Sequence, residues 1–107
     1  MDVRVSVRGL SADTGLRTYA AEKISDALRR FADRITTAQL WLEDLTGAAN
    51  PGHDNRCLID VHLRRGGEVV VRQESDDVLA CLGRGIERAK IAVSKQLARR
   101  KRGIGAG

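Results

Sequence analysis

The stretch that decides the fold is residues 56–74, which read R-C-L-I-D-V-H-L-R-R-G-G-E-V-V-V-R-Q-E. Apolar and polar side chains alternate through its first half, and three valines follow the turn signal Arg65-Gly66-Gly67. Alternation of this kind is typical of a strand that buries one face, and a glycine pair between two such runs is typical of a hairpin turn. The stretch therefore predicts two antiparallel strands, the first with Cys57, Ile59, Val61 and Leu63 inward, and the second from Glu68 to Glu74.

Two further strands are predicted upstream of this hairpin. Val3, Val5 and Val7 alternate with polar residues up to Gly9, which ends the first strand. Residues 35–43 predict a second strand, with Ala38, Leu40 and Leu42 inward and with Gln39, Trp41 and Glu43 outward. Residues 46–55 are rich in glycine, asparagine and proline, and predict a loop.

Two helices are predicted from the spacing of apolar residues. The first runs from about Asp13 to Phe31, with Ser11 and Asp13 as candidate N-caps. The second follows a cap at Ser75 or Asp76 and ends near Arg102, with Gly103 as its stop. Cys81 lies off the apolar face and is expected to be partly exposed. The expected apolar face consists of Val78, Leu79, Leu82, Ile86, Ala89, Val93 and Leu97.

The resulting order is β-α-β-β-β-α, which predicts an α+β fold. A right-handed crossover through the first helix makes the first two strands parallel, and hairpins add the other two. We expect a four-stranded mixed sheet with both helices on one face, in two layers. Residues 1–102 form one domain in this interpretation, and residues 103–107 form a disordered tail.

The charge is concentrated at one end of the chain. The net charge of the 107 residues is +5, but residues 84–107 hold eight Lys or Arg residues against one acid, Glu87. A local basic block favours a polyanionic partner. The sequence shows no signal peptide and no apolar run of the roughly 20 residues that span a bilayer. The two cysteines do not make a disulfide framework, so a cytoplasmic protein without a membrane partner is expected.

The basic residues of the second helix share one side of it. At about 100° per residue, they lie within roughly 60° of each other and opposite the apolar face. Such a stripe can match successive phosphates of folded RNA, and the alternative is a solvated helix face. A solvated face usually mixes charges of both signs, so we favour the binding face. Its members are Arg84, Arg88, Lys95, Arg99 and Arg102.

Weaker signals come from the first helix and from two glycines. Arg17, Lys23 and Arg30 are diluted by acids, although Lys23 and Arg30 flank the groove expected between the helices. Gly83 and Gly85 lie inside the second helix, where glycine is unfavourable. Close packing explains them better than a phosphate loop, because no third glycine follows.

The outward face of the sheet offers Trp41 among arginines. Trp41 could stack an RNA base, could cover Leu58 and Val70, or could form part of a patch for a partner protein. The covering role is favoured because one aromatic ring is little for a stacking platform.

No catalytic or metal constellation emerges from the sequence. The two histidines, His53 and His62, have no nucleophile at motif spacing. A zinc site from both histidines and both cysteines is disfavoured because Cys57 and His62 should point to opposite faces of one strand. We therefore expect no enzyme, no metal, no cofactor and no small-molecule substrate.

With these elements in order, the sequence resembles the ribosome hibernation promoting factor family, which includes the ribosome-associated inhibitor and the proteins once called sigma-54 modulation proteins. The resemblance covers Val3 to Lys101. It is carried by residues 14–19 (T-G-L-R-T-Y) with Glu22-Lys23, by residues 57–63 (C-L-I-D-V-H-L) before Gly66-Gly67, and by Asp77 and Arg99-Arg100-Lys101.

The resemblance implies a fold related to double-stranded RNA-binding domains and a place on the small ribosomal subunit. It implies contacts with ribosomal RNA through both helices and the silencing of idle ribosomes, with no metal or cofactor and no required oligomer. The residues it selects are Arg17, Lys23, Arg30, Arg84, Arg88, Lys95 and Arg99.

Three departures from the family pattern stand out. Leu79 replaces a frequent aromatic residue, and residues 50–57 are longer than in the best-known members. There is no C-terminal domain of the kind used to pair ribosomes, so the chain alone is not expected to dimerise them. The departures indicate a side branch of the family. The alternative function is that of a protein-binding regulatory module that uses the Trp41 face.

Overall fold

The structure is a computed structural model that describes residues 1–9, 14–45 and 54–106, with side chains up to Arg100. Its elements follow the predicted order. They are β1 (Asp2–Arg8), α1 (Thr14–Leu28), a 3-10 helix η1 (Arg29–Arg34), β2 (Ile35–Asp44), β3 (Asn55–Leu63), β4 (Glu68–Ser75) and α2 (Val78–Ala106). The predicted caps Ser11 and Asp13 lie outside the described residues, and so does the predicted loop over 46–55 apart from its last two residues, of which Asn55 already begins β3.

The four strands form one sheet in the order β1-β2-β3-β4. β1 and β2 pair in parallel, and the other two pairs are antiparallel, so the predicted mixed sheet is confirmed. In the β3–β4 turn, Arg65, Gly66 and Gly67 all have positive φ angles. Glycine adopts this backbone region without strain, which explains why a glycine pair occupies the turn.

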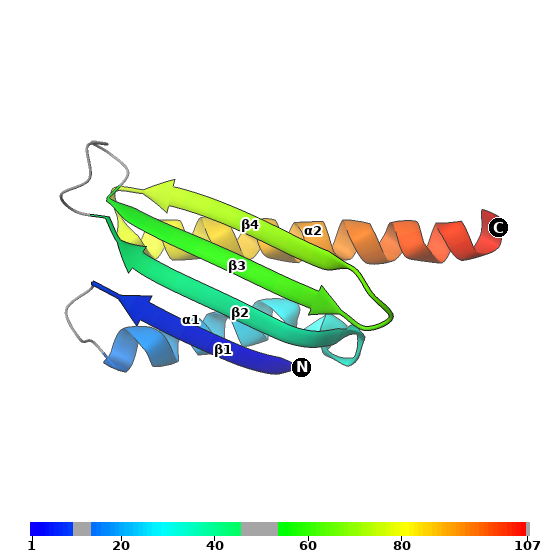
Figure 1. The fold of residues 1–107 in the computed structure, drawn as a ribbon, viewed down its shortest axis with the longest axis horizontal. Coiled ribbons are helices and arrows are strands. Elements are labelled where there is room, and N and C mark those ends of the chain that lie inside the picture. The colour runs from blue at the N-terminus through cyan, green and yellow to red at the C-terminus, as the bar shows by residue number, and fades with distance from the viewer. Residues whose placement is uncertain (10–13, 46–53, 107) are drawn as a thin grey trace.

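Both helices cover the same face of the sheet, as predicted (Figure 1). α1 lies behind β1 and β2, and α2 lies behind β3 and β4, with its C-terminal part projecting beyond the sheet (Figure 1). No helix of the described residues covers the opposite face of the sheet. We call it the open face.

The core lies between the sheet and the helices and is built almost entirely from aliphatic side chains. The predicted inward faces of β2 and β3 are confirmed, because Ala38, Leu40, Leu42, Cys57, Ile59 and Val61 are fully buried. From the helices come Ala20, Ile24 and Leu28 of α1 and Leu82, Ile86, Ala89, Val93 and Leu97 of α2. Burial of this apolar surface is the main stabilising contribution to the fold.

The N-terminal cap of α2 is one residue later than predicted. Asp77 precedes the helix, and its Oδ1 accepts a hydrogen bond from the Leu79 backbone N–H at 3.3 Å. Ser75 Oγ instead accepts from the Asp77 N–H at 3.2 Å. The Asp77 side chain thus satisfies one of the N-terminal backbone donors that the helix itself cannot satisfy, and Ser75 satisfies the backbone N–H of the cap residue.

Two residues of the first turns of α2 differ from the helical-wheel expectation. Cys81 is fully buried rather than partly exposed, and its Sγ lies 3.2 Å from the Gln73 carbonyl oxygen of β4. Leu79, expected inward, is 54% exposed. The cause is that the first turns of α2 lie over the ends of β3 and β4, so their contact side is rotated from that of the later turns.

Burial also controls the chemistry of both thiols. It raises the pKa of Cys57 to about 12, and it raises the pKa of Cys81 above its ordinary value. The nucleophilic form of cysteine is the thiolate. Both cysteines are therefore core residues with little reactivity in the folded protein.

Gly85 brings α2 close to β3, because an added Cβ there would lie 3.2 Å from Cys57 Sγ. Close packing is therefore confirmed for Gly85, although against the sheet and not against the first helix. Apart from the nearby backbone of its own helix, no described atom lies within 4 Å of a Cβ added at Gly83, so the prediction of close packing is wrong for this glycine.

The end of α2 also differs from the prediction. The helix continues to Ala106, past the expected stop at Gly103 and through most of the expected disordered tail. Glycine lowers helix propensity by about 1 kcal/mol relative to alanine but does not forbid the helix, and no proline follows.

Candidate nucleic-acid interface

The basic stripe predicted on α2 is present on its solvent side. Arg84, Arg88, Lys95 and Arg99 are all exposed, opposite the buried residues of the same helix. We call these four residues the α2 basic face. Arg102 belongs to the predicted stripe, but its side chain lies outside the described part of the structure.

The charges of the α2 basic face are not neutralised by acids of the chain. Across the described side chains, the ion pairs join Arg4 to Asp2, Arg29 to Asp26, Arg56 to Glu43, His62 to Asp60 and Glu68, and Arg72 to Glu74. None of these includes a residue of α2. The sheet and α1 therefore pair part of their charge internally, whereas the four cations of the α2 basic face stay available to an outside anion.

Arg88 is the one member of the α2 basic face whose orientation is fixed by the fold. Its Nη1 donates to the Arg72 carbonyl oxygen at 2.7 Å and to Gln73 Oε1 at 3.0 Å. Both acceptors are uncharged, so the guanidinium keeps its positive charge and still has free N–H donors. Arg88 thus links the stripe to β4 without losing its capacity to bind an anion.

Arg100 lies on a different side of α2 and has a structural role that the sequence did not indicate. Its guanidinium donates to the carbonyl oxygens of Arg64, at 2.7 Å, and of Gly66. These carbonyls belong to the β3–β4 turn. Arg100 therefore ties the late part of α2 to the hairpin, and its charge is partly used in doing so.

The cations predicted on the first helix are separated in the structure, because Arg17 and Lys23 lie in α1 whereas Arg30 lies in the 3-10 helix η1 that follows it. Lys23 lines a groove of about 280 Å³ between the helices, together with Tyr19, Leu79 and Glu87. Its Nζ lies 5.5 Å from the centre of the Tyr19 ring, and the Arg30 guanidinium lies 5.1 Å from the centre of the Phe31 ring. These are cation–π contacts, which position a cation but leave its charge in place.

Arg17 lies apart from these residues. It lines a hollow of about 570 Å³ with Arg8, Trp41 and Leu58, next to the C-terminal ends of β1 and β2. The structure therefore brings together the four α2 cations, places Lys23 at the groove, and separates Arg17 from both.

The open face shows why Trp41 is a weak candidate for base stacking. Trp41 lies directly opposite Leu58 in the β2–β3 register, and both are half-buried. This register agrees with a role of Trp41 in covering Leu58, which stays a prediction. Val70 does not share this cover, because its partner in the register is Asp60 and its side chain is 59% exposed.

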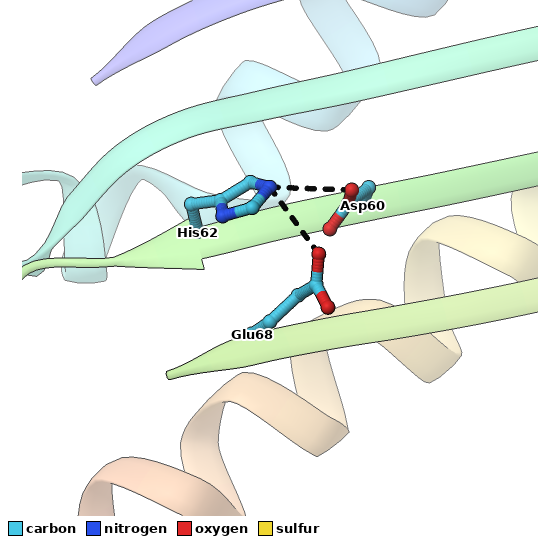
Figure 2. Close-up of side chains that lie close together, drawn as sticks. All are labelled: Asp60, His62 and Glu68. Atoms are coloured by element: carbon cyan, nitrogen blue, oxygen red, sulfur yellow. Dashed lines mark hydrogen bonds and ion pairs between the residues drawn. The ribbon is translucent and has the colours of Figure 1, made fainter. Parts of the chain in front are cut away.

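A cluster of possible metal ligands that the sequence analysis missed lies on the same face. Asp60, His62 and Glu68 come together from β3 and β4 (Figure 2). The zinc site considered earlier is not formed, because Cys57 is buried under the helices and His62 is exposed on the open face; His53 lies outside the described residues. The signal for the new cluster was the hairpin register, which sets Glu68 opposite His62.

Among the described residues, no helix has both the length and the apolar character that crossing a lipid bilayer requires.

Comparisons with known proteins agree with this architecture. The crystal structure of the Thermus thermophilus Protein Y N-terminal domain matches with a TM-score of 0.70 and 27% sequence identity, over 89% of this chain and 98% of that one. A ribosomal subunit interface protein from Coxiella burnetii matches with a TM-score of 0.67, over 92% of this chain and 99% of its own. Its 20% identity shows a shared fold alone. A comparison with curated proteins finds no match.

The sequence carries the evidence for the family itself. The family model described as sigma 54 modulation protein / S30EA ribosomal protein matches residues 3–101, almost the whole chain. This agrees with the resemblance stated from the residues, and with the order of strands and helices. The chain belongs to the sigma 54 modulation protein / S30EA ribosomal protein family.

Proposed function

We propose that this protein associates with the ribosome, binds ribosomal RNA of the small subunit through the α2 basic face, and silences translation while bound. The observation that carries the proposal is the row of exposed cations on α2 that no acid of the described chain neutralises. Membership of the S30EA family supports the ribosome as the source of the anion.

The dimensions of the α2 basic face suit a folded RNA. Arg84 and Arg99 are four helical turns apart, which places them about 22 Å from each other along the axis. A double-stranded nucleic acid carries closely spaced phosphates along such a length, and each Lys or Arg that neutralises one releases a bound counterion. Four cations along one helix therefore give an affinity that depends strongly on salt.

We expect the protein to recognise the shape and the charge of the RNA. Contacts to phosphates position a protein without reading base sequence, and double-stranded RNA is recognised mainly through its shape and backbone. The fixed guanidinium of Arg88 sets the orientation, and Arg84, Lys95 and Arg99 adapt to the phosphates. We assign secondary contacts to Arg17, Lys23, Arg30 and Arg102.

Silencing in this proposal follows from occupancy. A domain that covers the RNA path of the small subunit blocks initiation without any chemical step, so neither a cofactor nor a second copy of the chain is required. The same mechanism makes the protein a reversible factor, because a rise in competing ligands displaces it.

The experiment is co-sedimentation of the purified chain with isolated 30S subunits. Reversing the three α2 cations that have no partner (Arg84→Glu, Lys95→Glu and Arg99→Glu) should abolish binding, because each change replaces an attraction to phosphate by a repulsion. A control with the same change in net charge reverses three arginines off the helix, Arg4, Arg64 and Arg72, and should keep most of the binding.

The control also tests the alternative function. If the control variant loses binding and the α2 variant keeps it, the open face and not α2 is the interface. In that case Trp41→Ala should also release the partner, and the binding should depend little on salt. Circular dichroism of each variant confirms that the loss does not come from unfolding.

The silencing step has its own measurement. The wild-type protein, added to a cell-free translation reaction in excess over ribosomes, should lower the yield, and the α2 variant should not. Equal inhibition by both proteins would separate silencing from the α2 basic face.

A further inference from the structure

We propose that Asp60, His62 and Glu68 form a binding site for a divalent transition-metal ion of the Zn²⁺ class on the open face of the sheet. The three side chains converge above β3 and β4 (Figure 2), and one ligand atom of each lies within 4.8 Å of the others. The site is separate from the α2 basic face, which lies on the helical side of the molecule, and it does not rest on the proposed function.

The sheet holds these ligands rigidly. His62 of β3 and Glu68 of β4 are direct partners in the antiparallel register. Asp60 lies two residues before His62, so its side chain points to the same face of the same strand. Ligands on paired strands keep their separation better than ligands on loops, and the Gly66-Gly67 turn closes the hairpin next to them.

The distances fit a metal centre. His62 Nε2 lies 3.2 Å from Asp60 Oδ2 and 3.3 Å from Glu68 Oε2. Zinc binds imidazole nitrogen and carboxylate oxygen at about 2.0–2.2 Å in a tetrahedron, which places neighbouring ligand atoms about 3.3 Å apart. The two separations around His62 Nε2 therefore match those of ligands around one ion.

Hydrogen bonding alone satisfies this cluster poorly. Nε2 carries at most one hydrogen, so it cannot donate fully to two carboxylates. The second oxygen of Asp60, Oδ1, is buried and has no hydrogen-bond partner in the described structure. Two carboxylates at one nitrogen also repel each other. A divalent cation would be bound by Asp60 Oδ2, by Glu68 Oε2 and by the lone pair of a neutral imidazole, which relieves the repulsion between the two carboxylates.

The direct cross-strand partners of Asp60 and His62 carry no positive charge. In the register, Asp60 lies between Gln39 and Val70, and His62 lies between Thr37 and Glu68. None of these neighbours is basic. His62 and Glu68 are about half exposed, so an ion can enter directly from solvent.

The ligand atoms of the cluster indicate which class of ion it would bind. One imidazole nitrogen with two carboxylate oxygens suits Zn²⁺ and other first-row transition metals, whereas Mg²⁺ and Ca²⁺ prefer oxygen ligands alone. Three protein ligands leave at least one coordination position for water or for a group of a partner molecule. Binding of a divalent ion would neutralise the two negative charges of this patch.

The test uses the full untagged chain with ZnCl₂ and CoCl₂ as probes, by isothermal titration calorimetry and by the visible spectrum of bound Co²⁺. We expect one equivalent to bind. His62→Ala should weaken affinity by at least roughly tenfold, because loss of even an outer-sphere partner costs 10–100-fold. Asp60→Asn and Glu68→Gln should also weaken it.

The matched control is His53→Ala, since His53 and His62 are the two histidines of the chain; this variant should bind as the wild type does. Equal affinity of the His62→Ala variant, or the absence of saturable binding, would overturn the proposal. A near-ultraviolet charge-transfer band of Co²⁺ would also overturn it, by assigning the metal to the thiolates of Cys57 and Cys81. None of these readouts involves the ribosome.

Discussion

Arg99 and Arg100 are neighbours in the sequence with the same charge, but the fold gives them different environments. Arg99 points to solvent within the α2 basic face, without a partner among the described residues. Arg100 is half-buried and donates hydrogen bonds to the Arg64 and Gly66 carbonyls of the hairpin turn. Side-chain direction on the helix, and not residue type, therefore separates binding from stability here.

This difference predicts opposite effects of two neighbouring substitutions. Arg100→Ala should lower the free energy of unfolding by about 1 kcal/mol, because the turn loses charged hydrogen-bond donors that lie near solvent. Arg99→Ala should change it by less than about 0.5 kcal/mol, as surface substitutions usually do. Urea denaturation measures both, and the 30S assay should show the reverse order of effects. Equal stability of the two variants would mean that the Arg100 contacts contribute nothing.

Contacts of individual side chains were also the features that could least be predicted from the sequence. The exposure of Arg84, Lys95 and Arg99 followed from helical spacing alone. The contacts of Arg88 and Arg100 did not, because they join residues 15 to 36 positions apart and depend on how α2 lies across the sheet. The Asp60–His62–Glu68 cluster could have been found, since the glycine turn fixes the register that sets Glu68 opposite His62.

At the scale of the element, α2 carries two glycines that look equivalent in the sequence but have different surroundings in the structure. Gly85 is buried against β3, where an added Cβ would lie 3.2 Å from Cys57 Sγ. Gly83 is exposed, with open space around the same position. Gly83 lowers the stability of the helix without a packing reason, whereas Gly85 allows the helix to approach the sheet.

Alanine at each position should therefore act differently. Gly83→Ala should stabilise the protein by about 0.5–1 kcal/mol through helix propensity. Gly85→Ala gains the same propensity but crowds a packed core, and overpacking costs about 1–3 kcal/mol, so the variant should be less stable than the wild type. Thermal unfolding of the two variants checks this order. A similar gain in both would show that α2 can move away from Cys57 at little cost.

The elements themselves were largely predictable. Alternation in residues 3–7, 38–42 and 57–63 located three strands and their inward faces, because a half-buried strand must alternate. The ends of α2 were less predictable. Cys81 and Leu79 exchanged their expected exposure because the first turns of the helix contact the sheet at a different angle from the later ones. The helix passes Gly103 because a single glycine weakens a helix without stopping it.

At the scale of the whole molecule, the two layers present two unlike surfaces. The helical layer shows a row of cations that pair with no acid of the described residues. The open face of the sheet shows paired charges, a half-buried Trp41 and the Asp60–His62–Glu68 cluster. In the proposed function, this division leaves the helical side for RNA and the open face for the proposed metal ion or for a partner. It also makes the two surfaces separable by mutation, as the charge-matched variants require.

The measurement that tests the central claim most directly is the salt dependence of 30S binding for the wild type and for a neutralised variant with Arg84→Gln, Lys95→Gln and Arg99→Gln. Each phosphate contact adds roughly 0.7–0.9 to the slope of log K against log salt concentration, so the variant should bind more weakly and with a slope lower by about two to three. An unchanged slope, with affinity preserved, would contradict the account, because it would mean that the exposed cations of α2 do not contact RNA phosphates.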